Sequence, residues 1–341
     1  MLNLFIAALA LITRTLFDAG EFKSIKPHFD GECESISGII GAEDIVIISD
    51  GFAIISSDDR RATLNGDNTQ GALFLYDINL RFLTNLTSSI DFEFHPHGIS
   101  TFYMEDMSMQ IAVVNHRSDE QTIEIFNLKN QVITHIKTIR GKHLISPNDI
   151  VLIDEYRFYM TNDHAVADPM AQKFYDYLQI PRSNVVFYDG DQLKVVAKGL
   201  TYANGINISK DAKSVYVAEC VGRKLSVFSR DLNSNDLDHE RSIPTKSAID
   251  NIELDDDGNL WIGSHPKTLA FTRHAKNEKK LSPSQVIKIS LDNEDNPVEE
   301  IYLNDGKLLS GSSVAAVFNN HLLIGAVFDE RFLHCTMNEQ P

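Results

Sequence analysis

Short clusters of oxygen-bearing side chains recur along this chain, each placed directly before a run of β-branched and other apolar residues. The clusters combine carboxylates with carboxamides and contain no cysteine, a mixture typical of ligands for a hard divalent cation. Neutral amide oxygens are frequent among them, which favours calcium, with its six to eight ligands, over magnesium. Any single pair could merely form a turn between strands, but recurrence in the same context indicates a shared site. The candidate ligands are Glu43, Asp44, Asn148, Asp149, Asn204, Asp250 and Asn251.

A common plan surrounds these clusters: a polar pair, a strand, a turn, and a second strand that ends on another polar residue. The second repeat opens at His97 and its second strand ends at His116, and a plainer sixth repeat opens at Ser312. The repeats start at intervals of 46 to 62 residues, which are the lengths of propeller blades. A small sheet cannot cover both of its own faces, so radial stacking of six units would bury those faces and leave only short edges. We therefore predict an all-β fold, a six-bladed β-propeller, whose innermost strands bring the polar pairs together at a central tunnel.

The composition predicts one propeller domain and no nucleic-acid partner. The apolar fraction of 43% is ample for a core, and no linker divides the chain after about residue 30, so residues 30–341 are expected to form the propeller. A formal net charge of −17 leaves no Lys/Arg surplus for phosphate groups. The acidity either serves solubility alone or belongs in part to sites for divalent cations.

The first 20 residues form a separate segment. The stretch from Leu2 to Ile12 is an unbroken apolar run, too short for an ordinary membrane span and typical of a signal-peptide core. Because no clear cleavage site follows it, residues 1–20 are expected to be a removed signal, an uncleaved N-terminal anchor or a buried helix. The first two alternatives indicate a secreted or extracytoplasmic protein, periplasmic if bacterial, with membrane association if the anchor is retained.

Two of the three cysteines flank the repeats, with Cys33 ahead of the first and Cys335 after the last. A bridge between them would fasten the two ends of a circular array, and closing so long a loop could contribute about 4–5 kcal/mol. Export from the cytoplasm would allow such a bridge. Cys220 is left over, and we expect it to be a buried thiol at a strand end.

Several strings of residues resemble the paraoxonase family of serum-type arylesterases and lactonases, within a broader group of six-bladed lactonases that includes gluconolactonase-like proteins. Their common order and spacing carry the resemblance, which extends from about Cys33 to Cys335. The strings are Pro96-His97-Gly98-Ile99-Ser100, Val114-Asn115-His116, Asn148-Asp149-Ile150-Val151, Thr161-Asn162-Asp163-His164, Asn204-Gly205-Ile206 and Asp250-Asn251-Ile252.

The resemblance implies two calcium ions in the tunnel and assigns their ligands. The upper, catalytic ion would be held by Glu43, Asn148, Asn204, Asp250 and Asn251. The deeper, structural ion would be held by Asp44, Asp149 and the backbone carbonyl of Ile99. The resemblance also implies a catalytic histidine pair, a supporting pair beside it, and a terminal disulfide. These are His97 with His116, Asp163 with His164, and Cys33 with Cys335.

The activity implied by the resemblance is calcium-dependent opening of lactone rings. The upper ion would polarise the carbonyl, His97 would deprotonate a water molecule, and His116 would relay the proton. His97 could instead only orient the substrate. A sugar lactonase of the gluconolactonase type and a non-enzymatic, calcium-stabilised propeller that binds a partner remain alternatives. No Gly-x-Ser-x-Gly elbow occurs in the chain, which disfavours a covalent serine mechanism.

Residues around the mouth of the site are expected to set the substrate, a small-molecule lactone or ester. Tyr202, Val327 and Phe328 correspond to apolar wall positions of the family. Residues 58–71, predicted to form a mobile loop over the pocket, carry charges where mammalian members have an aromatic-bearing loop. Arylesterase activity would then be promiscuous, and phosphotriesterase activity weak or absent. A helix over 167–178 would either face a lipid surface, as in the family, or pack on the propeller; the oligomeric state stays open.

Overall fold

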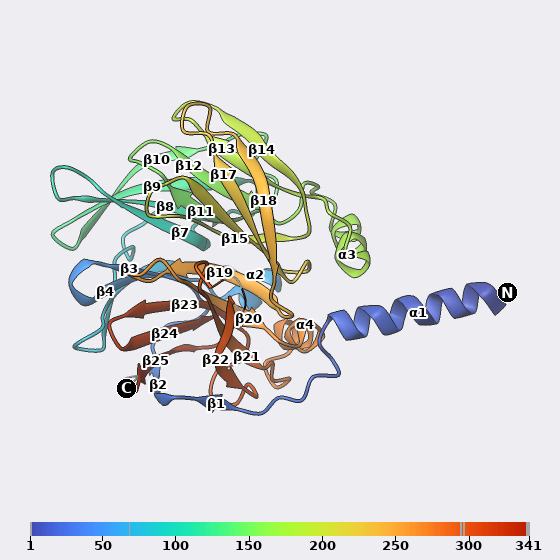
Figure 1. The fold of residues 1–341 in the computed structure, drawn as a ribbon. Helices are drawn as coiled ribbons and strands as arrows, with labels where there is room; N and C mark the ends of the chain where they lie inside the picture. The colour runs from blue at the N-terminus through green and yellow to red at the C-terminus, as the bar shows by residue number, and fades with distance from the viewer. Residues whose placement is uncertain (1, 68, 294, 296, 339–341) are drawn as a thin grey trace.

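The computed structural model describes residues 2–67, 69–293, 295 and 297–338. Its strands form six antiparallel sheets (Figure 1). The first strands of the six blades contact one another in cyclic order, β3 to β7, β11, β15, β19, β23 and back to β3. This closed ring of innermost strands confirms the predicted six-bladed β-propeller.

Four blades consist of four consecutive strands each. Blade 1 contains β3 (Ala42–Ile48), β4 (Phe52–Ser57), β5 (Ala72–Asp77) and β6 (Phe82–Asn85). Blade 2 contains β7 (Pro96–Tyr103), β8 (Met109–His116), β9 (Gln121–Lys129) and β10 (Val132–Ile139). Blade 3 contains β11 (Pro147–Leu152), β12 (Phe158–Asn162), β13 (Ser183–Tyr188) and β14 (Leu193–Leu200). Blade 4 contains β15 (Ala203–Ile208), β16 (Ser214–Glu219), β17 (Lys224–Arg230) and β18 (Leu237–Pro244).

The last two blades include strands from the N-terminal part of the chain. Blade 5 contains β19 (Ala248–Leu254), β20 (Leu260–His265), β21 (Ser284–Ile289), β22 (Val298–Asn304) and, at its edge, β1 (His28–Phe29). Blade 6 contains β23 (Ser312–Phe318), β24 (His321–Ala326), β25 (Arg331–Met337) and β2 (Gly31–Ser37).

Blade 6 closes the ring because it is built from both ends of the chain. Strand β2 pairs with β25, and in this pairing Cys33 lies directly opposite Cys335. The two cysteines form a disulfide across 302 residues of sequence, which confirms the predicted bridge. Cys220 is a buried free thiol, as expected.

The hydrophobic core lies between neighbouring blades and not along the axis. One cluster packs Val114 and Ile123 of blade 2 against Ile150 and Met160 of blade 3, and the other clusters join blades in the same way. Burying each such side chain contributes about 1.5–3 kcal/mol. Since the blade faces take up the apolar residues, the ends of the innermost strands are free to carry polar ones.

The helices gather at one end of the propeller. They are α1 (Leu2–Asp18), α2 (Arg60–Leu64), α3 (Pro169–Leu178) and α4 (Thr268–Lys276), and a 3-10 turn, η1, spans Ser49–Gly51. Helix α3 starts where the Asp168 side chain accepts a hydrogen bond from the Ala171 N–H, with Pro169 in the first turn, as its sequence predicts. Helix α1 projects from the blades beside α3 and α4 (Figure 1). Within the part of the chain that is described, no helix has both the length and the apolar character needed to cross a membrane.

Candidate active site

Every innermost strand carries a β-bulge close to its first residue. The pairing register of β3, β7, β11, β15, β19 and β23 with the next strand shifts there in all six blades. A bulge sets an extra residue into one strand and re-aims the side chains beside it. Glu43, His97, Asn148, Asn204 and Asp250 each lie inside one of these shifted stretches. The bulges therefore break the usual alternation of side chains between the two faces of the strand at the point where the polar pairs meet the tunnel. All five residues line one cavity.

Four buried oxygen atoms near the start of the innermost strands have no hydrogen-bond partner among the described residues. They are Oε2 of Glu43 and the Oδ1 atoms of Asn148, Asn204 and Asn251. The amide of Asn251 is oriented by donation from its Nδ2 to Glu43 Oε1 at 2.9 Å, and Nδ2 of Asn148 lies 3.5 Å from Asp163 Oδ2. A buried acceptor left without a donor costs about 1–3 kcal/mol. Because all four atoms are acceptors, a cation is the partner that fits them.

Buried carboxylates also crowd the tunnel. Burial and the nearby Glu43 raise the pKa of Asp44 well above its usual value, and burial and Asp44 do the same to the pKa of Asp149. Burial raises the pKa of Asp250, with Glu43 contributing. Among the described residues, no three side chains of the His, Cys, Asp and Glu types are arranged to hold an ion by themselves. Any ligand set here would therefore include amide or backbone oxygens, a composition that suits calcium.

The residues predicted for the deeper ion are held by backbone groups of neighbouring blades. Oδ2 of Asp44 accepts a hydrogen bond from the Ile99 N–H at 2.8 Å, and Oδ2 of Asp149 accepts one from the Ile206 N–H at 2.7 Å. At Gly98 a Cβ atom would come within 2.4 Å of Asp149 Oδ1. Only glycine permits this approach, so backbone groups of blades 2 and 4 hold carboxylates of blades 1 and 3.

The predicted histidine pair is in direct contact. Nδ1 of His97 lies 2.6 Å from Nε2 of His116, and Nδ1 of His116 contacts Oε1 of Gln121. The amide oxygen of Gln121 accepts a hydrogen bond from Nδ1–H of His116, so Nε2 of His116 accepts one from Nδ1–H of His97. Nε2 of His97 lies 3.3 Å from Glu43 Oε1, close enough to donate to that carboxylate when the ring is protonated. Burial and the nearby His97 lower the pKa of His116 to about 3, which keeps it neutral. Burial favours the protonated form of Glu43, but His97 and Arg60 outweigh it and lower the pKa of Glu43 to about 2.

Gln121 is a site residue that the sequence patterns did not indicate. It lies directly across the β8–β9 ladder from His116. Its position five residues after a histidine, at the far side of a short hairpin connection, was a usable signal. Its role is to set which ring nitrogen of His116 carries the proton.

The predicted supporting pair links the tunnel to helix α3. Nδ1 of His164 lies 2.8 Å from Asp163 Oδ1, and its Nε2 lies 2.9 Å from Asp176 Oδ1 on α3. Burial lowers the pKa of His164, but its two carboxylate partners more than compensate and raise it to about 9. The charged imidazole thus ties α3 to the end of β12, while Asp163 contacts the amide of Asn148.

Replacing His164 with glutamine should lower stability near neutral pH and have little effect in alkali. The folded-state pKa of His164 is raised from 6.5 to about 9, so its stabilising contribution is complete below about pH 6.5 and is lost as pH rises through about 9. A shift of this size corresponds to at most about 3 kcal/mol. Melting temperatures of wild type and His164→Gln at about pH 7 and about pH 10 test this. The exposed His239→Gln substitution is the control, and an equal deficit of His164→Gln at both pH values would contradict the assignment.

A cavity of about 520 Å³ lies above these residues. Glu43, His97, Asn148, Asn204 and Asp250 line it, and it is walled by the predicted substrate-pocket residues Tyr202, Val327 and Phe328 together with side chains of α3, α4 and the base of α1. Four of the five residues predicted for the upper ion thus line one pocket with the predicted walls, and Asn251, the fifth, contacts Glu43 without lining the pocket. Asp44, Asp149 and Ile99 do not line it.

The segment 58–71 differs from the open loop that we expected. It contains helix α2, and residues at the N-terminal end of that helix have buried partners: Asp58 Oδ1 lies 2.8 Å from His95 Nδ1, and Arg61 donates to the Phe328 carbonyl at 2.8 Å. Arg60, between these anchors, lies over the cavity with its Nη2 3.3 Å from the Pro96 carbonyl oxygen. These charged residues bind scaffold atoms, which is why the segment packs against the propeller.

His265 also supports the site more directly than its place at a strand end suggested. It is buried, its Nε2 lies 2.9 Å from Asp250 Oδ2, and its ring stacks on Phe271 of α4 with ring centroids 3.8 Å apart. This contact orients a predicted calcium ligand from outside the tunnel.

The fold and the tunnel place this chain among six-bladed propellers with a polar central site. A luciferin-regenerating enzyme superposes with a TM-score of 0.57 at 13% identity, covering 90% of this chain and 95% of that one. A candidate gluconolactonase superposes with a TM-score of 0.56 at 12% identity, covering 93% and 96%. At such identities the likeness shows the fold alone.

Sequence comparison then identifies the family. Residues 21–337 match the arylesterase family model. The chain is 36% identical over 328 residues to serum paraoxonase/arylesterase 1 of Homo sapiens, covering 92% of this chain and 91% of that protein. It is 34% identical over 323 residues to serum paraoxonase/arylesterase 2 of Homo sapiens, covering 91% and 89%. The chain belongs to the arylesterase family, which confirms the resemblance found in the sequence.

Proposed function

We propose that this chain is a calcium-dependent hydrolase that opens lactone rings, with promiscuous arylesterase activity and weak or absent phosphotriesterase activity. The observation that carries the proposal is the set of four buried acceptor oxygens that have no hydrogen-bond partner among the described residues, in the site that also holds the His97–His116 pair. Family membership supports the ester-hydrolase class, since its relatives are named paraoxonase/arylesterase.

The donor set fits two calcium ions. Glu43, Asn148, Asn204, Asp250 and Asn251 would hold the upper ion. Asp44, Asp149 and the carbonyl oxygen of Ile99 would hold the deeper one. The mixture of anionic and neutral oxygens without sulfur or nitrogen suits calcium. When bound, the upper ion supplies Lewis-acid stabilisation of the negative charge that develops on a carbonyl oxygen under attack.

The proton chemistry belongs to the side chains. In neutral His97, Gln121 and His116 keep the ring proton on Nδ1, so Nε2 can accept a proton from water on the cavity side. Glu43 Oε1, 3.3 Å from Nε2, would then stabilise the protonated ring. His97 can pass its other proton, on Nδ1, to neutral His116 at 2.6 Å. His97 is therefore the proposed general base and His116 its proton acceptor.

The cavity walls favour a substrate with an apolar tail. Tyr202, Val327 and Phe328 line the pocket together with Leu269 and Phe271 of α4. Such walls suit an alkyl or acyl chain on the lactone. They suit a polyhydroxylated ring less well, and this disfavours the alternative of a sugar lactonase.

A panel of substrates tests the proposal. Lactones of graded tail length should be hydrolysed with kcat/KM increasing with tail length, an aryl ester more slowly, and a phosphotriester weakly or not at all. Each added methylene that is buried is worth up to about 0.8 kcal/mol, or about fourfold. Hydrolysis of aldonolactones but not of tailed lactones would instead support the sugar lactonase. No hydrolysis of any substrate by calcium-loaded protein would support the non-enzymatic propeller.

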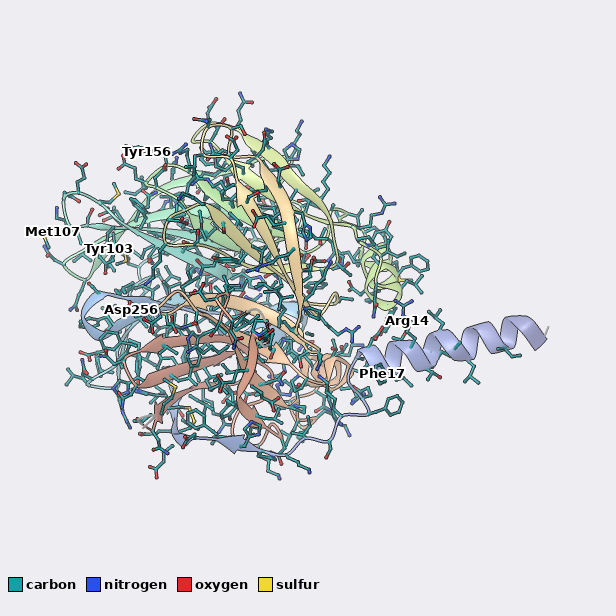
Figure 2. All side chains as sticks on the ribbon, in the orientation of Figure 1. Arg14, Phe17, Tyr103, Met107, Tyr156 and Asp256 are labelled. Atoms are coloured by element: carbon teal, nitrogen blue, oxygen red, sulfur yellow. A yellow bond between two sulfur atoms is a disulfide. The ribbon has the colours of Figure 1, made fainter. Side chains whose placement is uncertain are left out.

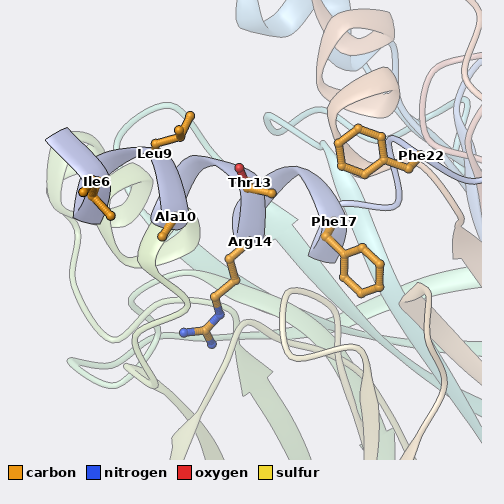
Figure 3. Close-up of a pocket in the computed structure, with 7 residues that line it drawn as sticks. All are labelled: Ile6, Leu9, Ala10, Thr13, Arg14, Phe17 and Phe22. Carbon is orange, nitrogen blue, oxygen red and sulfur yellow. The ribbon is translucent and has the colours of Figure 1, made fainter.

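We also propose that the protein is secreted or extracytoplasmic and associates with a lipid surface through α1 and α3. The Cys33–Cys335 disulfide fits an oxidising compartment. Apolar side chains of α1 and of the segment after it, including Ile6, Leu9 and Phe17, form an exposed groove (Figure 3). Phe17→Ser should weaken sedimentation with phospholipid vesicles, whereas Phe82→Ser, which removes a comparably exposed ring from a blade edge, should not. Equal binding of both variants and wild type would contradict the proposal.

A further inference from the structure

A second cavity, of about 260 Å³, lies at the other end of the tunnel. It is lined by residues late in the innermost strands, such as Val46, Val151 and Ile208, whereas the active-site cavity is lined by the first residues of the same strands. We call this second cavity the far vestibule. It opens away from α1, α3 and α4, near the turn that carries Asp256, which lies at the opposite side of the molecule from Arg14 and Phe17 (Figure 2).

The two cavities divide the predicted calcium ligands between them. The active-site cavity touches Glu43, Asn148, Asn204 and Asp250, and the far vestibule touches Ile99 and Asp149. No residue lines both cavities. Two of the three groups predicted for the deeper ion are therefore reached from the face opposite the active site, and Asp44 lines neither cavity.

Glu253 is placed to act on a cation in the far vestibule. It follows Asn251 by two residues on β19 and lines the vestibule, where Asp149 is the one other carboxylate in the described lining. Its side chain makes no hydrogen bond or ion pair with another described residue, so it has no structural partner there. Lys210 lines the same cavity, and its Nζ donates to the carbonyl oxygen of Asp256. Burial and the nearby Asp44 raise the pKa of Glu253 well above its usual value, a cost that a cation beside the carboxylate would offset. One acidic and one basic side chain thus lie along the approach to Asp149.

We propose that the deeper calcium ion exchanges with solvent through the far vestibule, where Glu253 attracts the ion in transit and Lys210 opposes it. The inference rests on the calcium binding in the proposed function, but not on lactone hydrolysis. A charge in a narrow, low-dielectric channel acts strongly on an ion that passes it. Since Glu253 stabilises the ion in transit and not at its final position, it changes the rate of exchange more than the affinity.

Isotopic exchange of calcium in the calcium-loaded, full-length protein at low ionic strength tests this. We expect two phases, one for each ion. Glu253→Gln should slow one phase by about 3- to 10-fold, and Lys210→Gln should accelerate the same phase by a similar factor, the scale of losing one nearby charge. The calcium dissociation constants should change less than the rates. High salt should shrink both effects.

Asp256→Asn is the matched control, because it removes one negative charge from the turn that follows β19, at a residue that does not line the vestibule. It should leave both phases unchanged. The proposal is overturned if Glu253→Gln exchanges like wild type, if Asp256→Asn has the same effect, or if wild type binds only one ion. If wild type hydrolyses lactones but the Glu253→Gln variant exchanges calcium at the wild-type rate, this inference alone is overturned. If calcium exchange follows the expected pattern but no lactone is hydrolysed, only the proposed activity is overturned.

Discussion

Replacing His97 with glutamine is expected to lower kcat for lactone hydrolysis by about 10²–10⁴-fold, the usual contribution of a general base. In the structure, Nε2 of His97 faces the cavity 3.3 Å from Glu43 Oε1, and its Nδ1 lies 2.6 Å from His116. Glutamine keeps a polar group there but cannot accept a proton from water near neutral pH. Steady-state kinetics on a tailed lactone, with the melting temperature as a check of folding, measure the effect.

Two further variants make the result specific. His239→Gln changes an exposed histidine of β18 and should retain full activity. Gln121→Met removes the contact that selects the tautomer of His116 and should cause a smaller loss of kcat. If His97→Gln raises KM while kcat is kept, His97 orients the substrate and is not the base.

Removing calcium with a chelator is expected to abolish hydrolysis and lower the melting temperature by roughly 5–10 °C. An ion that binds only the folded state stabilises the protein by about 4 kcal/mol when its free concentration is about a thousand times its dissociation constant. Without the ions, Asp44 and Asp149 are buried close to each other's charge, and Glu43 Oε2 and the Oδ1 atoms of three asparagines have no hydrogen-bond partner among the described residues. The ions would remove both costs. Activity assays and thermal melts with calcium, with magnesium and with chelator test this.

Asp250→Asn sharpens the calcium test because it removes a charge and keeps an oxygen that can accept from His265, which lies 2.9 Å from Asp250 Oδ2. Burial raises the pKa of Asp250, so loss of its charge should cost little in chelator but should reduce the stabilisation that calcium provides. The exposed Asp211→Asn substitution should behave as wild type in both conditions. Full activity of the wild type in chelator would refute the proposed mechanism.

The order of the polar pairs along the chain predicted much of this molecule. Pairs such as Asn148-Asp149 and Asp250-Asn251, repeated at blade-length intervals ahead of strands, indicated both the propeller and the tunnel. The positions of Cys33 and Cys335 predicted the ring closure that the structure confirms. These features could be read because each depends on residue type and spacing alone.

The directions of the side chains depended on tertiary structure. The bulges that place Asn148 and Asp149 toward different cavities arise from strand pairing, which involves residues distant in sequence. The same holds for the contact of Gln121 with His116 and for the packing of α2 between His95 and Phe328. The sequence by itself determined which oxygen-bearing and proton-accepting groups reach the axis. Only the tertiary structure decided where each group points, because that depends on a partner in another strand or blade.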